Sequence, residues 1–116
     1  MYIKYVEHEL KALFESEPIS IAEKEVGMFI YSKEDNRGAK FILNCSIYEK
    51  KCTISLGLGD STALKLSLED VASLVVHDDI LKIRQNNSEK EYIIYFEPNF
   101  YITFDKKINE SPPTLA

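Results

Sequence analysis

The residues with the clearest capacity for chemistry are three neighbouring ionisable side chains, His77, Asp78 and Asp79. A histidine beside carboxylates can ligate a metal ion or act as a general base. A metal site needs several converging ligands, and the other histidine, His8, stands far away in the chain. Because adjacent side chains of an extended segment point to opposite faces, these three need not converge. We therefore interpret the cluster as a helix end followed by a polar turn, and we predict no metal site.

Two cysteines, Cys45 and Cys52, are the candidate nucleophiles. Both fall on apolar strand faces across a predicted hairpin, where they could face each other. A buried cysteine behaves as a small hydrophobic residue, and burial disfavours the reactive thiolate. No histidine stands near either cysteine in the sequence to act as a base. We expect two reduced thiols of a cytoplasmic protein, and whether they pair with each other stays open.

A glycine-rich segment at residues 57–62 has some features of a phosphate-binding loop. The dinucleotide fingerprint needs a third glycine, and the P-loop needs Gly-Lys followed by Ser or Thr; neither is present. We interpret the segment as a turn and predict no cofactor. Without a visible nucleophile, acid–base pair or metal set, we also predict that the chain is not an enzyme.

Acidic residues are more informative as a group. Four lie on or near the first predicted helix, and others cluster in loops, where tyrosines accompany them. Tyrosine offers a large contact area and is enriched at interface hot spots. We predict an acidic, aromatic docking face whose candidate partner-binding residues are Glu34, Asp35, Asp60, Glu69, Asp70, Asp78, Asp79, Tyr31, Tyr48, Tyr95 and Tyr101.

Composition places limits on the partner. The chain has 116 residues, 45% of them hydrophobic, and a formal net charge of −5, which predicts one globular domain over residues 1–116. Negative charge repels nucleic-acid phosphates and anionic membranes, so we expect neither as a partner. The same charge speeds encounter with a basic protein. The N-terminal stretch is amphipathic and carries acids, and no apolar run is long enough to span a membrane, so we predict a cytoplasmic protein.

An amphipathic helix is predicted for the first sixteen residues. Apolar residues recur there at helical spacing: Ile3, Val6, Leu10, Leu13 and Phe14. Pro18 disfavours helical backbone at the preceding residue, so the helix should end near Ser16. The segment 20–23 has capping-box spacing, which predicts one further helical turn closed by Gly27.

Strands follow, in two meanders. Residues 28–33, 39–48 and 52–58 form the first predicted meander, since apolar residues alternate along the second and third of these strands. Residues 63–66 could be a short strand. A short central helix is then predicted from Ser67, with Leu68, Val71, Ala72 and Val75 as its buried stripe, although β-branched valines lose rotamer freedom in helices.

The segment 80–105 is the second predicted meander, rich in Ile, Tyr and Phe. Both faces of its strand at 91–97 are apolar, so the first helix or a partner must cover the second face. Residues 106–116 should form a frayed tail. The predicted fold is therefore α+β: an antiparallel sheet of about six strands in two meanders, an N-terminal helix and a short central helix. One curved sheet and two packed sheets are both compatible with this order.

In size, charge and element order the chain resembles small acidic bacterial immunity proteins of contact-dependent inhibition and other polymorphic toxin systems. The resemblance implies a cognate protein toxin, often a basic nuclease domain, whose activity is blocked by complementary acids. An alternative is an acidic secretion chaperone of type III systems, which is similar in its leading helix, three strands and second helix but ends in another helix. A small enzyme or a ligand-binding module is a further alternative. A monomer and a dimer both remain open.

Overall fold

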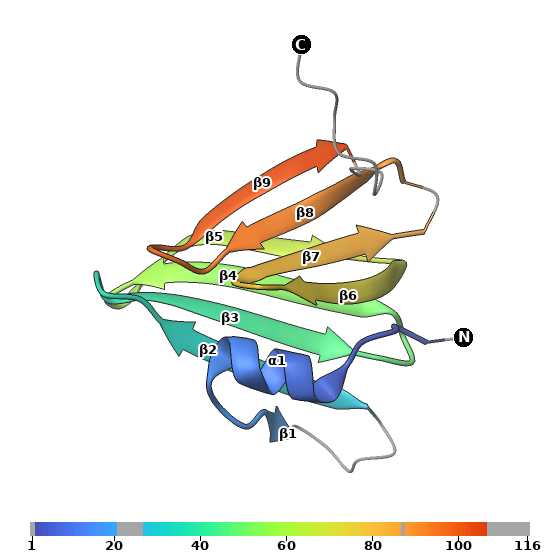
Figure 1. The fold of residues 1–116 in the computed structure, drawn as a ribbon, viewed down its shortest axis with the longest axis horizontal. Helices are drawn as coiled ribbons and strands as arrows, with labels where there is room; N and C mark the ends of the chain where they lie inside the picture. Colours follow the sequence, from blue (N-terminus) through green and yellow to red (C-terminus); the bar gives the residue numbers. More distant parts are fainter. Residues whose placement is uncertain (1, 21–26, 87, 107–116) are drawn as a thin grey trace.

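The computed structural model describes residues 2–20, 27–86 and 88–106 (Figure 1). They contain one helix and nine strands, and the strands form two antiparallel sheets. The first sheet has the order β1-β2-β3-β4-β5 and the second β6-β7-β8-β9, so each strand pairs with its neighbour in the chain. The bounds are α1 (Glu7–Phe14), β1 (Ile19–Ser20), β2 (Met28–Glu34), β3 (Ala39–Ser46), β4 (Lys51–Leu58), β5 (Ser61–Leu68), β6 (Val71–His77), β7 (Ile80–Gln85), β8 (Lys90–Tyr95) and β9 (Tyr101–Lys106).

The predicted central helix is wrong. Its residues form the end of β5, a tight turn at 69–70 and strand β6. A register irregularity between Val71 and Ser73 places Val71 and Leu74 among the buried residues, and this three-residue spacing imitates a helical stripe. Because β-branched valines fit a pleated strand better than a helix, the strand is formed. Apart from the two-residue β1, the described residues therefore contain eight strands instead of about six.

The first helix is shorter than predicted. Ile3 is buried but lies in an extended segment, where its N–H donates to the carbonyl of Ile47 at 3.1 Å. The next residue, Lys4, makes a parallel bridge to Ser73 on β6. Val6 is the N-cap and is exposed, whereas Leu10, Leu13 and Phe14 are buried as expected. The helix ends at Phe14, two residues before Ser16, and its C-cap Glu15 has a left-handed φ of 55°.

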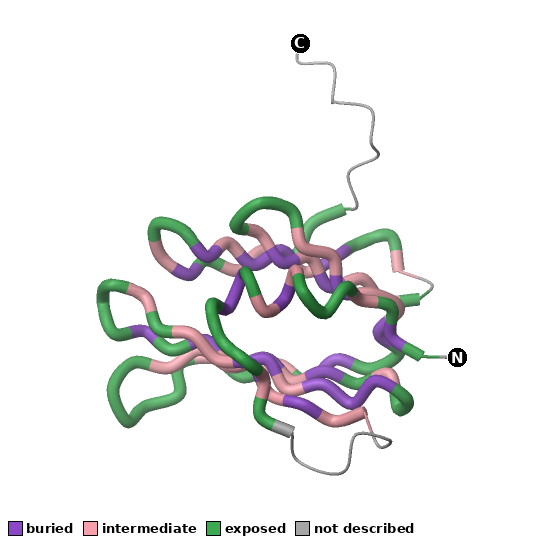
Figure 2. The backbone as a smooth tube through the Cα atoms, turned by 60° about the horizontal axis from the view of Figure 1, so that its bottom comes forward, coloured by how far each residue is buried: buried purple, intermediate pink, exposed green. Residues whose placement is uncertain are grey.

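The two sheets pack over a common core. Of the two arrangements compatible with the sequence, the structure therefore has two packed sheets and not one curved sheet. Buried side chains of both sheets belong to one cluster, for example Leu43 and Ile54 from the first and Leu81 and Ile94 from the second. Figure 2 shows α1 between the two layers, and Phe14 contributes from it to the same cluster. Hydrophobic burial therefore holds three pieces together: two sheets and a helix that contacts both.

Strand β8 carries apolar residues on both faces, as predicted, but its outer face also holds the buried Glu91, whose carboxylate pairs with Arg84 of β7 at 2.7 Å. Ile94 belongs to the common core, and the following Phe96 meets Phe14 of α1 edge to face, with ring centroids 5.1 Å apart. Ile93 lies on the other face, outside the core cluster, but it too is buried. Its register neighbours there are Lys82 on β7 and Thr103 on β9. The helix thus packs on the inner face only.

Two predicted segments lie largely outside the described residues. The helical turn at 20–23 begins at Ser20, the last residue of β1, and its remainder falls outside. Of the predicted tail at 106–116, Lys106 is described and ends β9. In the described part of the chain, no helix is long and apolar enough to cross a membrane.

Candidate partner-binding cleft

One end of the two-sheet structure gathers acidic side chains. The turn after β2 (35–38), the turn after β6 (78–79) and the loop after β8 (96–100) all lie at this end, on the left in Figure 1. Together with α1 they line two adjoining cavities of about 360 and 190 Å³, which share Glu15, Lys33 and Glu97. We call this region the acidic cleft; its acidic lining residues are Glu9, Glu15, Glu34, Asp35, Asp78, Asp79 and Glu97.

Lys33 is the one lysine or arginine among the described residues that line the cleft. Its ammonium donates to the carbonyl of Leu13 at 3.2 Å and pairs with the Glu15 carboxylate at 3.3 Å. It also lies 5.9 Å from the ring centroid of Phe96, within cation–π range. Because these contacts are internal and the side chain is only 17% exposed, Lys33 binds α1 to β2 and leaves the cleft strongly negative.

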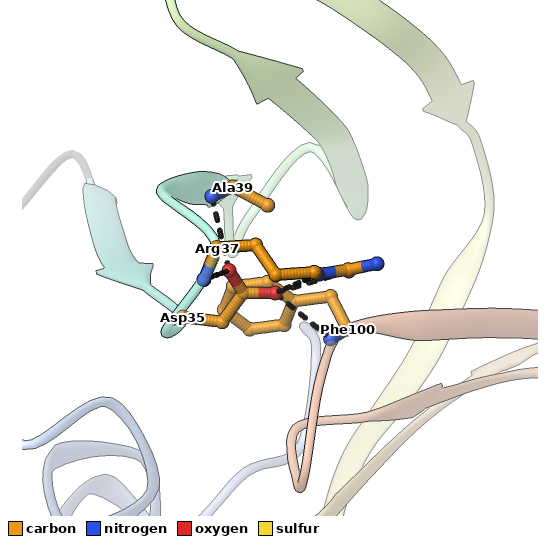
Figure 3. Close-up of polar contacts among 4 residues, drawn as sticks. All are labelled: Asp35, Arg37, Ala39 and Phe100. Carbon is orange, nitrogen blue, oxygen red and sulfur yellow. Dashed lines mark hydrogen bonds and ion pairs between the residues drawn. The ribbon is translucent and has the colours of Figure 1, made fainter.

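Asp35 is the most enclosed acid of the cleft, with a side chain only 3% exposed (Figure 3). Oδ1 accepts hydrogen bonds from the backbone N–H groups of Arg37 at 2.9 Å and Ala39 at 3.0 Å. Oδ2 accepts from the Arg37 guanidinium at 3.1 Å and from the backbone N–H of Phe100 at 3.4 Å. Burial raises the pKa of the carboxyl, but these hydrogen bonds outweigh burial and bring the pKa below its ordinary value of 3.8.

A phenylalanine cluster lies beneath these turns. Phe41 of β3, Phe96 and Phe100 contact one another, with ring centroids 5.2 to 5.6 Å apart. Phe14 joins them from α1, 5.1 Å from Phe96 and 6.0 Å from Phe41. Stacked and edge-to-face pairs of this kind add to the stabilisation from area burial alone. Of these rings, Phe96 and Phe100 line the smaller cavity, and Phe14 and Phe41 support them from the core.

Four of the predicted partner-binding acids meet in this cleft: Glu34, Asp35, Asp78 and Asp79. Sequence reasoning missed Glu97 altogether and treated Glu9 and Glu15 only as acids of the first helix. A signal for Glu97 existed, because it follows a strand that runs parallel to β6 two strands away and so ends at the same edge.

The other predicted acids do not line the cleft. Asp60 is exposed in the turn between β4 and β5 and lines neither cavity. Glu69 and Asp70 stand at the opposite end of β6 from Asp78, and they pair with Lys51 at 3.8 Å and Lys50 at 3.1 Å. A hydrogen bond from Asn86 and the neighbouring Lys50 lower the pKa of Asp70. Local cations thus offset these acids.

The predicted tyrosines separate in the same way. Tyr31 is 1% exposed and stacks on Phe14 at 5.0 Å, so its expected place on the surface is wrong. Its strand alternates buried and half-buried residues, and Tyr31 points to the core. Tyr48 is exposed at the far end of β3. Tyr95 and Tyr101 oppose each other on β8 and β9, 5.7 Å apart, and they flank the loop that carries Glu97.

The remaining candidates for chemistry are placed as follows. Cys45 and Cys52 are directly opposed on β3 and β4, with their Sγ atoms 2.9 Å apart, and both are buried free thiols. Burial, followed by the contact with Cys52, raises the pKa of Cys45 well above its ordinary value, which disfavours a nucleophilic thiolate. His77 is exposed, 3.6 Å from Asp78. Within the described ranges, no three metal-binding side chains converge.

The architecture is thus that of a small two-sheet protein with one helix between its layers and an acidic cleft at one end. No family model and no curated protein sequence matches the chain. Its fold is similar to that of a chain in the contact-dependent growth inhibition toxin–immunity protein complex from Klebsiella pneumoniae 342. The two share 23% sequence identity with a TM-score of 0.79, over 92% of this chain and 100% of that one.

Proposed function

We propose that this chain is an immunity protein, which binds a cognate toxin and neutralises it. The observation that carries the proposal is the likeness in fold, over nearly the whole chain, to a chain of a toxin–immunity protein complex. The net charge of −5 and the acidic cleft supply an independent physical reason to expect a protein partner of opposite charge.

The acidic cleft is the proposed contact surface. Acids from α1 and three separate turns face it, and its internal cation, Lys33, is already engaged by Leu13 and Glu15. Such a concentration of one sign of charge steers a basic partner and fixes its orientation. Lysine and arginine side chains of the toxin would take the place of water around these carboxylates.

A basic nuclease domain fits this chemistry best. A nuclease needs lysine and arginine to bind phosphates, so its substrate surface is positively charged. Carboxylates of the cleft would pair with the same side chains and exclude the nucleic acid. Tyr95 and Tyr101, beside the loop that bears Glu97, would supply aromatic contact area at the edge of this surface.

The structure removes one of the features on which the secretion-chaperone alternative was based. That alternative relied on a second helix after the first meander, and β5 and β6 occupy those residues. No contact in the described residues gives a particular reason to prefer an enzyme or a small-molecule binding module.

The test is co-expression with the neighbouring toxin gene. Wild-type chain should protect cells from growth arrest and should co-purify with the toxin. The double substitution Asp78→Lys and Asp79→Lys should abolish protection, since it reverses two charges within the cleft. Glu69→Lys combined with Glu89→Lys is the matched control, because it makes the same charge change at exposed positions of the opposite end, outside the cleft, and should still protect.

Two results would contradict the proposal. Failure of the wild-type chain to bind or protect against any neighbouring toxin would remove the immunity function. Equal loss of protection in both double variants would retain that function but show that overall charge, and not the acidic cleft, governs binding.

A further inference from the structure

Asp35 differs from the other acids of the cleft because its oxygens are already occupied. Its side chain is almost fully buried, and the Arg37 guanidinium neutralises it at 3.1 Å. We propose that Asp35 is a positioning residue: it holds the turn 35–38 of the first sheet against the loop 96–100 of the second and so sets the shape of the acidic cleft for a basic protein partner. The identity of that partner rests on the proposed function.

The two carboxylate oxygens of Asp35 have different tasks. Oδ1 accepts from the N–H groups of Arg37 and Ala39, both within its own turn, at 2.9 and 3.0 Å. Oδ2 accepts the N–H of Phe100, which belongs to the second sheet's loop, at 3.4 Å (Figure 3). One oxygen thus builds the turn, and the other joins the turn to the opposite sheet.

The bond to Phe100 is the directional part of this junction. Among the hydrogen bonds of the described residues, it is the one that joins the first sheet to the loop 96–100. The other contacts there are ring contacts of Phe41 with Phe96 and Phe100 and the cation–π contact of Lys33 with Phe96, which hold the layers at a distance without fixing an angle. Hydrogen bonds restrict geometry more tightly than apolar contacts do.

The junction between Asp35 and Phe100 lies beside acids of the proposed contact surface, which gives it a role in binding. Glu34 immediately precedes Asp35, and Glu97 lies in the loop that Phe100 closes; both line the smaller cavity. Their spacing depends on how the turn and the loop are held together. A preorganised arrangement reduces the cost of ordering charged groups when the partner binds.

Asp35→Asn separates the two tasks. Asparagine keeps one oxygen for the N–H groups of the turn, where it is a favoured residue. Its amide NH₂ replaces Oδ2 and meets the N–H of Phe100, donor against donor. Glu34→Gln is the matched control, because it removes the same charge from the same cleft but breaks no hydrogen bond of the junction.

Two measurements test the role: amide hydrogen exchange of Phe100 in the free protein, and the dissociation rate of the toxin complex. Asp35→Asn should speed both by roughly tenfold, the effect of losing one hydrogen bond to a charged acceptor. Glu34→Gln should leave Phe100 exchange unchanged and should mainly slow association, as expected for loss of a steering charge.

The outcomes separate the two proposals. Unchanged Phe100 exchange in Asp35→Asn overturns the junction, and faster exchange with unchanged dissociation overturns its role in binding. A wild-type chain that binds no toxin overturns the proposed function, while Phe100 exchange still decides the junction. If Asp35→Asn does not fold, the Phe100 amide shift of the wild-type chain should follow protonation of Asp35 in acid; an amide that does not titrate overturns the proposal.

Discussion

At the scale of single residues, burial changes the pKa of some side chains in this protein. Tyr31 illustrates this: burial against Phe14 and Phe29, followed by the charge of Glu7, raises its pKa to about 12. The phenol is therefore kept neutral in the folded chain well above the pH at which an exposed tyrosine ionises. The consequence is a coupling between folding and alkaline pH.

Tyr31→Phe should reduce the loss of stability at high pH. In the wild-type chain the folded pKa of Tyr31 exceeds the ordinary 10.0, so its contribution is complete below pH 10 and is lost as the pH rises through about 12. Urea unfolding at several pH values from 9 to 12 measures the slope. Tyr48→Phe, at an exposed position, should keep the wild-type slope, and an unchanged slope in Tyr31→Phe would contradict the assignment.

At the scale of elements, α1 is the piece that joins the layers. Its eight residues are too few for an isolated helix to be stable in water, so tertiary packing must hold it. Leu10, Leu13 and Phe14 supply that packing, and Phe14 reaches rings of β2, β3 and the loop after β8. Loss of this ring should weaken the whole structure and not only the helix.

Phe14→Ala should lower the free energy of unfolding by about 3–5 kcal/mol, the usual cost of deleting a fully buried phenylalanine. Val6→Ala, at the exposed N-cap of the same helix, should cost less than about 1 kcal/mol. Equilibrium denaturation by urea compares the two. A cost for Phe14→Ala no larger than that for Val6→Ala would show that α1 is not required to join the sheets.

The sequence allowed most of these elements to be predicted, and the failures have local causes. Strands β3 and β4 were predictable from alternating apolar residues, and β2 and β7 to β9 from β-branched and aromatic residues bounded by turn residues. At β6 the irregularity between Val71 and Ser73 changes the apolar spacing from two to three, which favours a helical interpretation. At the N-terminus Ile3 matched the helical stripe, but its N–H bonds to the carbonyl of Ile47, a long-range contact that no local pattern encodes.

The whole molecule assembles its candidate site from distant segments. Acids at Glu15, Asp35, Asp79 and Glu97 are far apart in sequence and become neighbours because turns of alternate strands share one end. The sequence could therefore supply candidate acids, but separating this set from Asp60, Glu69 and Asp70 required the stacking of the two sheets. Burial of Tyr31 was equally hidden, since its strand presents apolar residues on both faces.

Association with the proposed toxin partner should be strongly dependent on salt. The cleft concentrates negative charge on a molecule of net charge −5, and added salt screens steering beyond about 8 Å at physiological ionic strength. Raising NaCl from about 0.05 to 0.5 M should slow association by roughly tenfold or more with little change in dissociation. Stopped-flow kinetics would check this, and an association rate indifferent to salt would contradict electrostatic steering.

The sequential pairing of the strands also has a consequence for folding during synthesis. Within each sheet every strand pairs with its neighbour in the chain, and a two-residue turn at 69–70 passes the backbone from the first sheet to the second. Short loop closures of this kind make each ladder quick to form, so the first sheet can assemble while the second is still being translated. The ring of Phe14 leaves the ribosome early but meets Phe96 only near the end. The segment that forms α1 is therefore synthesised first, but the contact of Phe14 with the second sheet is among the last to form, and it completes the cooperative unit.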